Sequence, residues 1–144
     1  MAGRELDLTP EQAFRLVAAV GEHGRWVPFT RVSVPAPEPR AGDLVVARTA
    51  GLFVDRMRVV MVAPPRRLVL AKVGPVLLGS ATITVTPAGT RARVSWTYDA
   101  RLRGPLPAAL TGPALNHALD AMAALALWRM DRWVRHTRPA PPLP

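Results

Sequence analysis

The amino-acid sequence predicts an α+β fold: a curved antiparallel sheet of about seven strands around a long C-terminal helix, with two short helices after the first strand. Three observations support this prediction. Apolar residues between positions 113 and 136 recur at the three- and four-residue steps of a helix. Residues 76–101 alternate between apolar and polar, as strands with one covered face do. The segments between the two helical regions are short, apolar and separated by Pro and Gly, which is typical of strands in a meander.

The N-terminal segment predicts one strand and then a helix start. Residues 4–8 alternate between charged and apolar and form a short strand. Thr9 has the position of an N-cap, and Gln12 is placed three residues later to complete a capping box. The helix that follows is expected to stop at Gly21, and a second short helix or turn leads into Trp26, which we expect to face the interior.

The middle of the chain predicts six strands that are joined by turns. Pro and Gly residues separate the strands, because both residue types are unfavourable inside a strand. The expected strands are residues 29–34, 43–49, 54–62, 67–73, 76–86 and 90–101. In the last two, the residues expected to be buried are Ala81, Ile83, Val85, Ala92, Val94, Trp96, Tyr98 and Ala100.

The long helix is predicted over residues 113–136, after a break or kink at Gly112 and Pro113. Its apolar side contains Leu115, Leu119, Met122, Ala126, Met130 and Trp133. The opposite side, which we expect to face water, contains Asn116, His117, Asp120, Asp131 and Arg135. Residues 1–137 are therefore expected to form one domain, followed by a Pro-rich disordered tail over residues 138–144.

The composition limits the classes of function. The net charge is +9, but the basic residues are dispersed along the chain, and all except Lys72 are Arg. Because no nucleic-acid-binding motif accompanies this charge, we expect no nucleic-acid partner. There is no Cys, and the three His residues lie too far apart for a local metal motif, so no metal or cofactor is expected. The sequence has neither a signal-like N-terminus nor an uninterrupted apolar stretch of about 20 residues, which predicts a cytoplasmic protein without a membrane span.

Several segments together resemble one known superfamily. They are TPEQAF at residues 9–14, the following Trp26, VMVAPPRRLVL at 60–70, TPAGTRARVSWTY at 86–98, and the amphipathic last helix. This combination is similar to the START-like or Bet v 1-like superfamily, also called SRPBCC or the polyketide cyclase/dehydrase group. The resemblance covers roughly residues 4–137 and implies the helix-grip architecture with a hydrophobic cavity between sheet and helix. It provides no catalytic motif that matches this chain residue by residue.

The residues of the expected cavity follow from the predicted faces. Asp55 shares its strand face with Met57 and Met61, and lies near one end of that strand. Arg129 lies at the edge of the apolar side of the helix, where its head reaches either water or a ligand. The predicted ligand-binding set is Asp55, Met57, Met61, Ile83, Val94, Trp96, Tyr98, Leu119, Met122 and Arg129. The sequence leaves open whether the inward aromatic residues line a cavity or form solid core.

Three functions are compatible with the sequence. The first is the binding of a hydrophobic or aromatic small molecule, either lipid or polyketide-like, between the last helix and the sheet. The second is an aromatic polyketide cyclase or dehydratase, for which Asp55, Tyr98 and Arg129 are the residues to test. The third is a basic module that binds an acidic partner through the net charge of +9. The sequence does not identify the ligand, the oligomeric state or the presence of catalysis.

Overall fold

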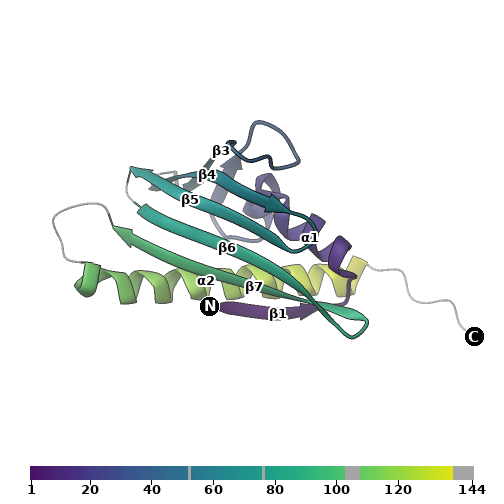
Figure 1. Ribbon diagram of the computed structural model, residues 1–144. Coiled ribbons are helices and arrows are strands. Elements are labelled where there is room, and N and C mark those ends of the chain that lie inside the picture. Colours follow the sequence, from purple (N-terminus) through teal and green to yellow (C-terminus); the bar gives the residue numbers. More distant parts are fainter. Residues whose placement is uncertain (52, 76, 103–107, 138–144) are drawn as a thin grey trace, which may run out of the picture.

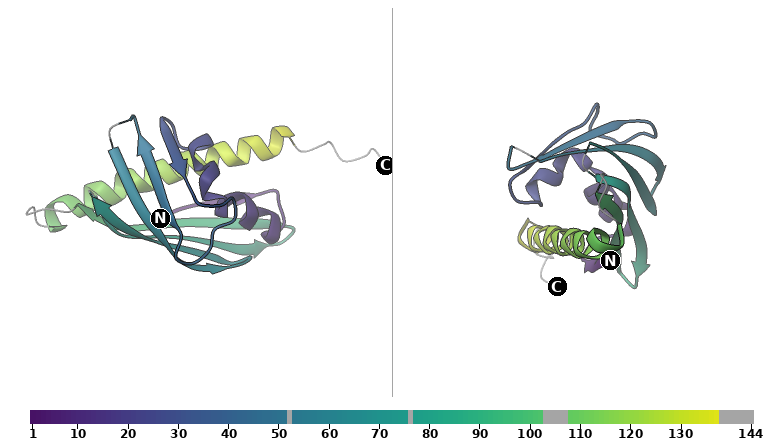
Figure 2. Two further views of the ribbon diagram at one scale, coloured as in Figure 1. Left: turned by 90° about the horizontal axis from the view of Figure 1, so that it is seen from above. Right: turned by 90° about the vertical axis from the view of Figure 1, so that its left-hand side faces the viewer.

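The computed structural model describes residues 1–51, 53–75, 77–102 and 108–137, and it confirms the predicted helix-grip architecture (Figure 1). A seven-stranded antiparallel sheet has the order β1-β7-β6-β5-β4-β3-β2. Figure 2 shows that this sheet curls around the long helix α2. The predicted Pro-rich tail, residues 138–144, lies outside the described residues. The elements are β1 (Ala2–Leu6), α1 (Pro10–Ala18), the 3-10 helix η1 (Val20–Arg25), β2 (Thr30–Ser33), β3 (Leu44–Thr49), β4 (Phe53–Ala63), β5 (Arg67–Pro75), β6 (Leu77–Ala88), β7 (Arg91–Leu102) and α2 (Ala108–Thr137).

The N-terminal elements form as predicted, with one shift in the first strand. The Gln12 backbone N–H donates to the Thr9 hydroxyl at 3.2 Å, and the Thr9 backbone N–H donates to the Gln12 side-chain oxygen at 3.1 Å, so the capping box is complete. The first strand covers Ala2–Leu6 instead of residues 4–8, because β1 pairs with β7 from Ala2 opposite Trp96. These contacts attach the N-terminus to the edge of the sheet beside α2.

A glycine of β6 allows a close approach of two strands in the curved sheet. Gly79 has a φ of +117°, which side-chain-bearing residues rarely adopt, and a Cβ atom there would lie 1.9 Å from the Asp99 carbonyl oxygen of β7. Glycine therefore lets β6 and β7 approach each other at this point. Register shifts in the β4–β5 pair, between Arg56 and Met57 and between Val59 and Met61, are β-bulge-like irregularities that bend a sheet.

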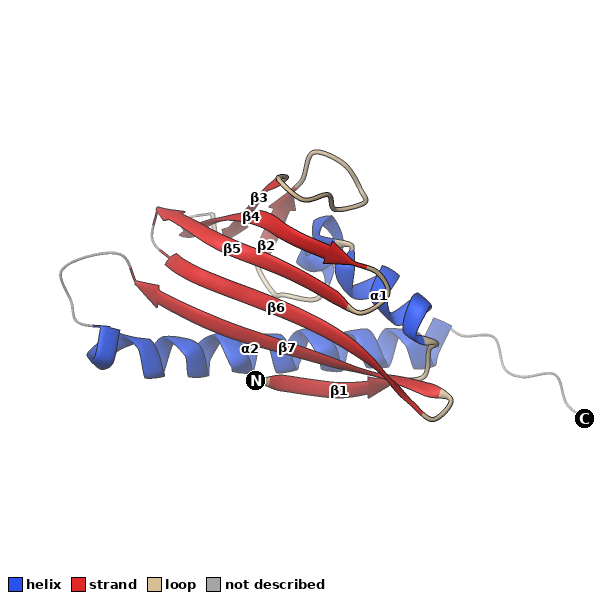
Figure 3. Cartoon of the chain, viewed as in Figure 1, coloured by secondary structure: helices blue, strands red, loops and turns tan. Residues whose placement is uncertain are grey.

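Helix α2 begins earlier than the sequence indicates. It runs from Ala108 through Gly112 and Pro113, so of the predicted break or kink the break does not occur. The Asn116 side chain supports this turn, because its Nδ2 donates to the Gly112 carbonyl oxygen at 2.9 Å. Proline removes one helical hydrogen bond but does not by itself end a helix whose neighbouring turns are held elsewhere. Figure 3 shows α2 extending along the sheet past both ends of β1.

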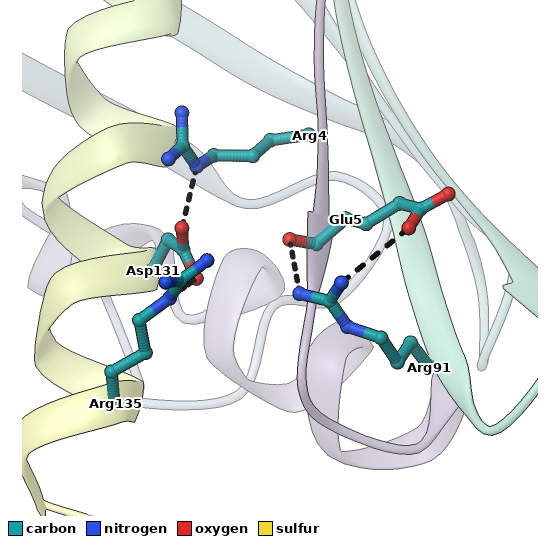
Figure 4. Close-up of polar contacts among 5 residues, drawn as sticks. All are labelled: Arg4, Glu5, Arg91, Asp131 and Arg135. Atoms are coloured by element: carbon teal, nitrogen blue, oxygen red, sulfur yellow. Dashed lines mark hydrogen bonds and ion pairs between the residues drawn. The ribbon is translucent and has the colours of Figure 1, made fainter.

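The buried side of α2 is rotated relative to the prediction. Its fully buried apolar residues are Ala123, Ala126, Leu127, Met130 and Val134. Asp131 belongs to the same buried side and is only 1% exposed, so its predicted position in water is wrong. It accepts hydrogen bonds from Arg4 Nε of β1 at 2.8 Å and from Arg135 Nε at 3.1 Å (Figure 4). Burial acts to raise the pKa of Asp131, but the hydrogen bonds from the two guanidinium groups prevail and lower it.

Asn116, also predicted to face water, is only partly exposed and binds the backbone of β7. Its Oδ1 accepts from the Ala100 backbone N–H of β7 at 2.9 Å, and its Nδ2 donates to the Ala100 carbonyl oxygen at 3.0 Å. The register of β1 on β7 ends at Trp96, so the amide of Asn116 takes the place of a strand partner four residues further along. A buried edge of β7 is satisfied in this way by the helix.

Candidate ligand-binding site

A small cavity of about 90 Å³ lies between the concave face of the sheet, η1 and α2. Strands β2 to β7 form its floor and walls, and Leu119 and Met122 of α2 form part of its roof. This is the location that the sequence predicted. The lining residues are His23, Val27, Thr30, Val32, Ala47, Thr49, Phe53, Asp55, Met57, Leu70, Lys72, Leu77, Ala81, Trp96, Tyr98, Leu119 and Met122.

The polar part of this cavity is a buried ion pair between neighbouring strands. Asp55 of β4 and Lys72 of β5 are both buried, and Lys72 Nζ donates a hydrogen bond to Asp55 Oδ2. Lys72 Nζ also lies 3.7 Å from Met57 Sδ. Asp55 Oδ1, the second carboxylate oxygen, is buried and has no hydrogen-bond partner among the described residues. Asp55, one of the residues that line the cavity, therefore has one carboxylate oxygen without a hydrogen-bond partner.

Two aromatic rings of β7 form the wall beside this ion pair. Trp96 and Tyr98 stack with their ring centroids 5.9 Å apart and an interplanar angle of 26°. Lys72 Nζ lies 5.3 Å from the centroid of the Tyr98 ring, within the range of a cation–π interaction. Burial, followed by the negative charge of Asp55, raises the pKa of the Tyr98 phenol, although the Trp96 indole acts in the opposite direction. Tyr98 is consequently a neutral hydroxyl at neutral pH.

His23 of η1 completes the aromatic part of the site. Its ring centroid lies 5.1 Å from that of Trp96, and its Nε2 lies 2.7 Å from the Val17 carbonyl oxygen. Because a carbonyl oxygen only accepts, Nε2 must carry the hydrogen. Burial lowers the pKa of His23, and the bond to Val17 opposes this effect only in part. The ring is therefore a neutral packing group and a fixed wall of the cavity.

Six of the ten predicted ligand-binding residues line this cavity. They are Asp55, Met57, Trp96, Tyr98, Leu119 and Met122. Ile83 and Val94 do not line it; both are completely buried and belong to the solid core of the β6–β7 hairpin. The hairpin thus contributes to both layers, with core near its turn and cavity wall further along the strands.

Met61 and Arg129 lie elsewhere. Met61 is 43% exposed, because the register shift between Val59 and Met61 changes the face on which the following residues lie, so Val62 packs on the core instead. The Arg129 head points to the Trp26 carbonyl oxygen, with Nη1 at 3.4 Å. Neither side chain is part of the cavity wall.

Lys72 and His23 line the cavity but were not among the residues predicted from the sequence. A signal for Lys72 was present, since Leu68, Leu70 and residue 72 share one strand face and both Leu residues are buried. Lys72 is also the one lysine in a chain with 18 Arg residues. His23 had no comparable signal, because a 3-10 helix of six residues provides no reliable periodicity.

Three larger depressions lie outside the sheet–helix space. One of about 510 Å³ follows Val32–Pro37 beside Gly21, and one of about 440 Å³ lies between α1 and Val62. A third, also of about 440 Å³, lies between α1, η1 and Trp133 of α2. Among the described residues, the first two include no unpaired buried polar atom, and the third includes one, Trp26 Nε1. The smaller cavity remains the better site because polar groups with unused hydrogen-bonding capacity converge there.

The described residues contain no group of three or more His, Cys, Asp or Glu side chains that is arranged to hold a metal ion. No helix in the described part of the chain is long and apolar enough to cross a membrane. The groups that the site offers to a ligand are therefore a carboxylate acceptor, an ammonium donor, a neutral phenol and apolar walls.

This geometry, a curved sheet that holds a long helix over a small mixed apolar and polar cavity, defines the class of helix-grip proteins. The family model described as "Polyketide cyclase / dehydrase and lipid transport" matches residues 2–134, and the chain belongs to that family. No curated protein sequence matches the chain significantly.

Solved structures have the same fold at low sequence identity. A START superfamily protein from Mycobacterium smegmatis is 13% identical with a TM-score of 0.74, and the match covers 94% of this chain and 96% of the other. Protein MLL2253 from Mesorhizobium loti is 15% identical with a TM-score of 0.70, covering 96% and 97%. Protein XoxI from Bacillus cereus is 14% identical with a TM-score of 0.69, covering 94% and 96%. At these identities the likeness concerns the fold.

Proposed function

We propose that this protein binds a small hydrophobic or aromatic molecule in the cavity between α2 and the sheet. The observation that carries the proposal is the combination of aromatic walls at Trp96 and Tyr98 with an unpaired buried oxygen of Asp55. An unsatisfied buried polar group costs about 1–3 kcal/mol, so a ligand that supplies a partner for this oxygen would be stabilised. The family description supports the proposal, because it includes both lipid transport and polyketide chemistry.

The size of the cavity favours a compact ligand. Its volume of about 90 Å³ is well below the roughly 300–1,000 Å³ of typical ligand pockets. Met57 and Met122 line the cavity, and their unbranched side chains adapt readily to a bound ring. A single aromatic ring is therefore a better candidate than a long-chain lipid.

Binding of toluene and of other one-ring probes tests the proposal. Trp96 lines the cavity, so a bound ring should change its fluorescence, and saturation at 100 times Kd should stabilise the fold by about 2.7 kcal/mol. Met122→Trp should fill the cavity and abolish binding. Leu125→Trp, on the exposed side of the same helix, is the matched control and should retain it. Unchanged fluorescence and Tm with every one-ring probe would contradict the proposal.

A cyclase or dehydratase is the second candidate, favoured by the carboxylate of Asp55 and the phenol of Tyr98 in one cavity. Arg129, which the sequence analysis added to this set, lies outside the cavity and is not part of it. Conversion of an enolisable aromatic polyketide mimic should then depend on Asp55 and not on Arg129. Loss of turnover in Asp55→Asn with full turnover in Arg129→Gln is the expected result. Binding of an acidic partner, a lipid ligand and a cytoplasmic location stay predictions.

A further inference from the structure

We infer that the ligand of this cavity is a neutral hydroxylated aromatic ring, and that its hydroxyl donates a hydrogen bond to Asp55 Oδ1. This inference rests on the proposed function and specifies its ligand class. Its basis is the hydrogen-bonding capacity that the side chains of the cavity leave unused.

The free acceptor is fixed in position. Lys72 holds Asp55 through Oδ2, while Oδ1 is buried without a hydrogen-bond partner in the described part of the chain. A carboxylate oxygen that is removed from water gains most from a strong donor, and hydrogen bonds to charged groups are worth about 1.5–3 kcal/mol. A ligand that presents an O–H group at this point satisfies the carboxylate. A purely hydrocarbon ligand leaves it unsatisfied.

The charges next to this acceptor select a neutral donor. An anionic ligand would place its charge against Asp55, and the positive charge of Lys72 is already paired. A cationic ligand would bring a second ammonium group next to the buried Lys72. Lys72 Nζ donates to Asp55, lies 3.7 Å from Met57 Sδ and lies 5.3 Å from the centroid of the Tyr98 ring.

The walls favour an aromatic ring attached to that hydroxyl. Trp96 and Tyr98 present ring surfaces, and Met57, Leu119 and Met122 add apolar contacts. Trp96 Nε1 is a second buried polar atom without a hydrogen-bond partner of good geometry among the described residues, and a hydroxyl oxygen can accept from it. A hydroxyl group is both donor and acceptor, so phenols and catechols carry the two functions that this cavity lacks.

Water is the alternative occupant. At about 30 Å³ for each molecule, a cavity of about 90 Å³ has room for roughly three water molecules, and one of them could donate to Asp55. Water alone would give no difference in affinity between probes. The experiment therefore compares phenol with toluene, which has a similar shape but no hydroxyl, and with benzoate, which carries a negative charge.

Isothermal titration at pH 7, where phenol is neutral, should show phenol binding at least tenfold more tightly than toluene, with no detectable binding of benzoate. The double variant Asp55→Asn/Lys72→Met removes both charges of the pair together, which avoids leaving either one buried alone. It should bind toluene as the wild type does and lose at least fivefold of the preference for phenol. Asp99→Asn, on the exposed side of β7, is the matched control and should retain the full preference.

Two results overturn the inference while leaving the proposed function intact. They are equal affinities for phenol and toluene in the wild type, and an unchanged phenol preference in the folded double variant. Tight binding of benzoate would likewise refute the assigned ligand class. If the wild type binds neither phenol nor toluene, the proposed function fails together with the inference.

Discussion

Replacing Lys72 by Met should strongly destabilise the protein, because it leaves Asp55 as a buried carboxylate without its partner. The Lys72 side chain is 2% exposed and that of Asp55 is 12% exposed, so water screens the pair only weakly. Removing one member of a buried ion pair costs about 3–5 kcal/mol. That loss is a large share of the 5–15 kcal/mol by which a typical domain is stable.

The reverse single change, Asp55→Asn, should be about as costly, because it leaves the ammonium group of Lys72 buried without a negative charge. The double variant should be far more stable than either. Asn has the shape of the carboxylate and Met has most of the length of the lysine stem, so two neutral groups of similar volume replace the pair. With single losses of about 3–5 kcal/mol each, a loss of about 1 kcal/mol in the double variant corresponds to a coupling free energy of about 5–9 kcal/mol.

Urea unfolding at pH 7, followed by Trp fluorescence, measures this cycle, and equal m-values show that the four proteins unfold in the same way. The exposed pair Arg25–Glu22, with an N–O distance of 3.7 Å, is the control. Glu22→Gln should change the free energy of unfolding by less than about 1 kcal/mol. If both single variants lie within about 1 kcal/mol of the wild type, or if the double variant loses the sum of their effects, the pair is not the buried, coupled unit described above.

Three further changes test other parts of the structure. Gly79→Ala should cost about 4 kcal/mol or more, because its Cβ would meet the Asp99 carbonyl oxygen in a bent strand. The free energy of unfolding should fall as the pH drops below about 6.5. His23 takes up a proton there in the unfolded chain, whereas the buried ring of the folded protein resists protonation. His23→Gln should therefore remove this loss of stability. Asp131→Asn should lower the free energy of unfolding by about 2 kcal/mol at pH 7, a value that is reduced because its Arg partners are partly exposed. This difference from the wild type should shrink below about pH 4, because the Asp in the unfolded chain is protonated there.

Each of these changes has its own control. Gly89 also has a positive φ, of +62°, but a Cβ atom there meets nothing within 4 Å, so Gly89→Ala should cost only about 1–2 kcal/mol. A Gly79→Ala variant that is no less stable than Gly89→Ala would refute the steric argument. His117 is exposed, so His117→Gln should keep the pH dependence of the wild type. If His23→Gln still loses stability at acid pH, His23 does not have the role assigned to it. If Asp131→Asn has the same free energy of unfolding as the wild type at pH 7, the role of Asp131 is contradicted.

The fold could be predicted from the sequence because its local signals agree with each other. The capping box at Thr9 and Gln12, the alternation in β6 and β7, and the helical period of α2 each depend on neighbouring residues and recur in the structure. The boundaries were less predictable. Pro113 indicates a helix break by its local chemistry, but Asn116 supports the turn that contains it through a contact no local pattern shows.

The candidate site was predictable where strand alternation is regular and not where it is interrupted. Trp96 and Tyr98 lie on a regular strand and were placed correctly on the inner face, whereas Met61 follows a register shift that the sequence does not reveal. Lys72 was overlooked for a different reason. Its strand face was readable, but a charged residue is rarely buried without a partner, and the pairing of β4 with β5 that supplies Asp55 is a property of the folded sheet.

The polar residues of α2 explain how a cavity can persist beneath a helix that packs on a sheet. A continuous apolar stripe would draw the helix onto the sheet along its whole length, since interiors pack densely. In this chain Asn116 binds the backbone of β7, and Asp131 binds Arg4 of β1, so hydrogen bonds hold the helix at both ends of the segment between them. Leu119 and Met122, the roof of the cavity, lie in that segment. These two polar contacts therefore fix α2 on both sides of the segment that lies over the cavity.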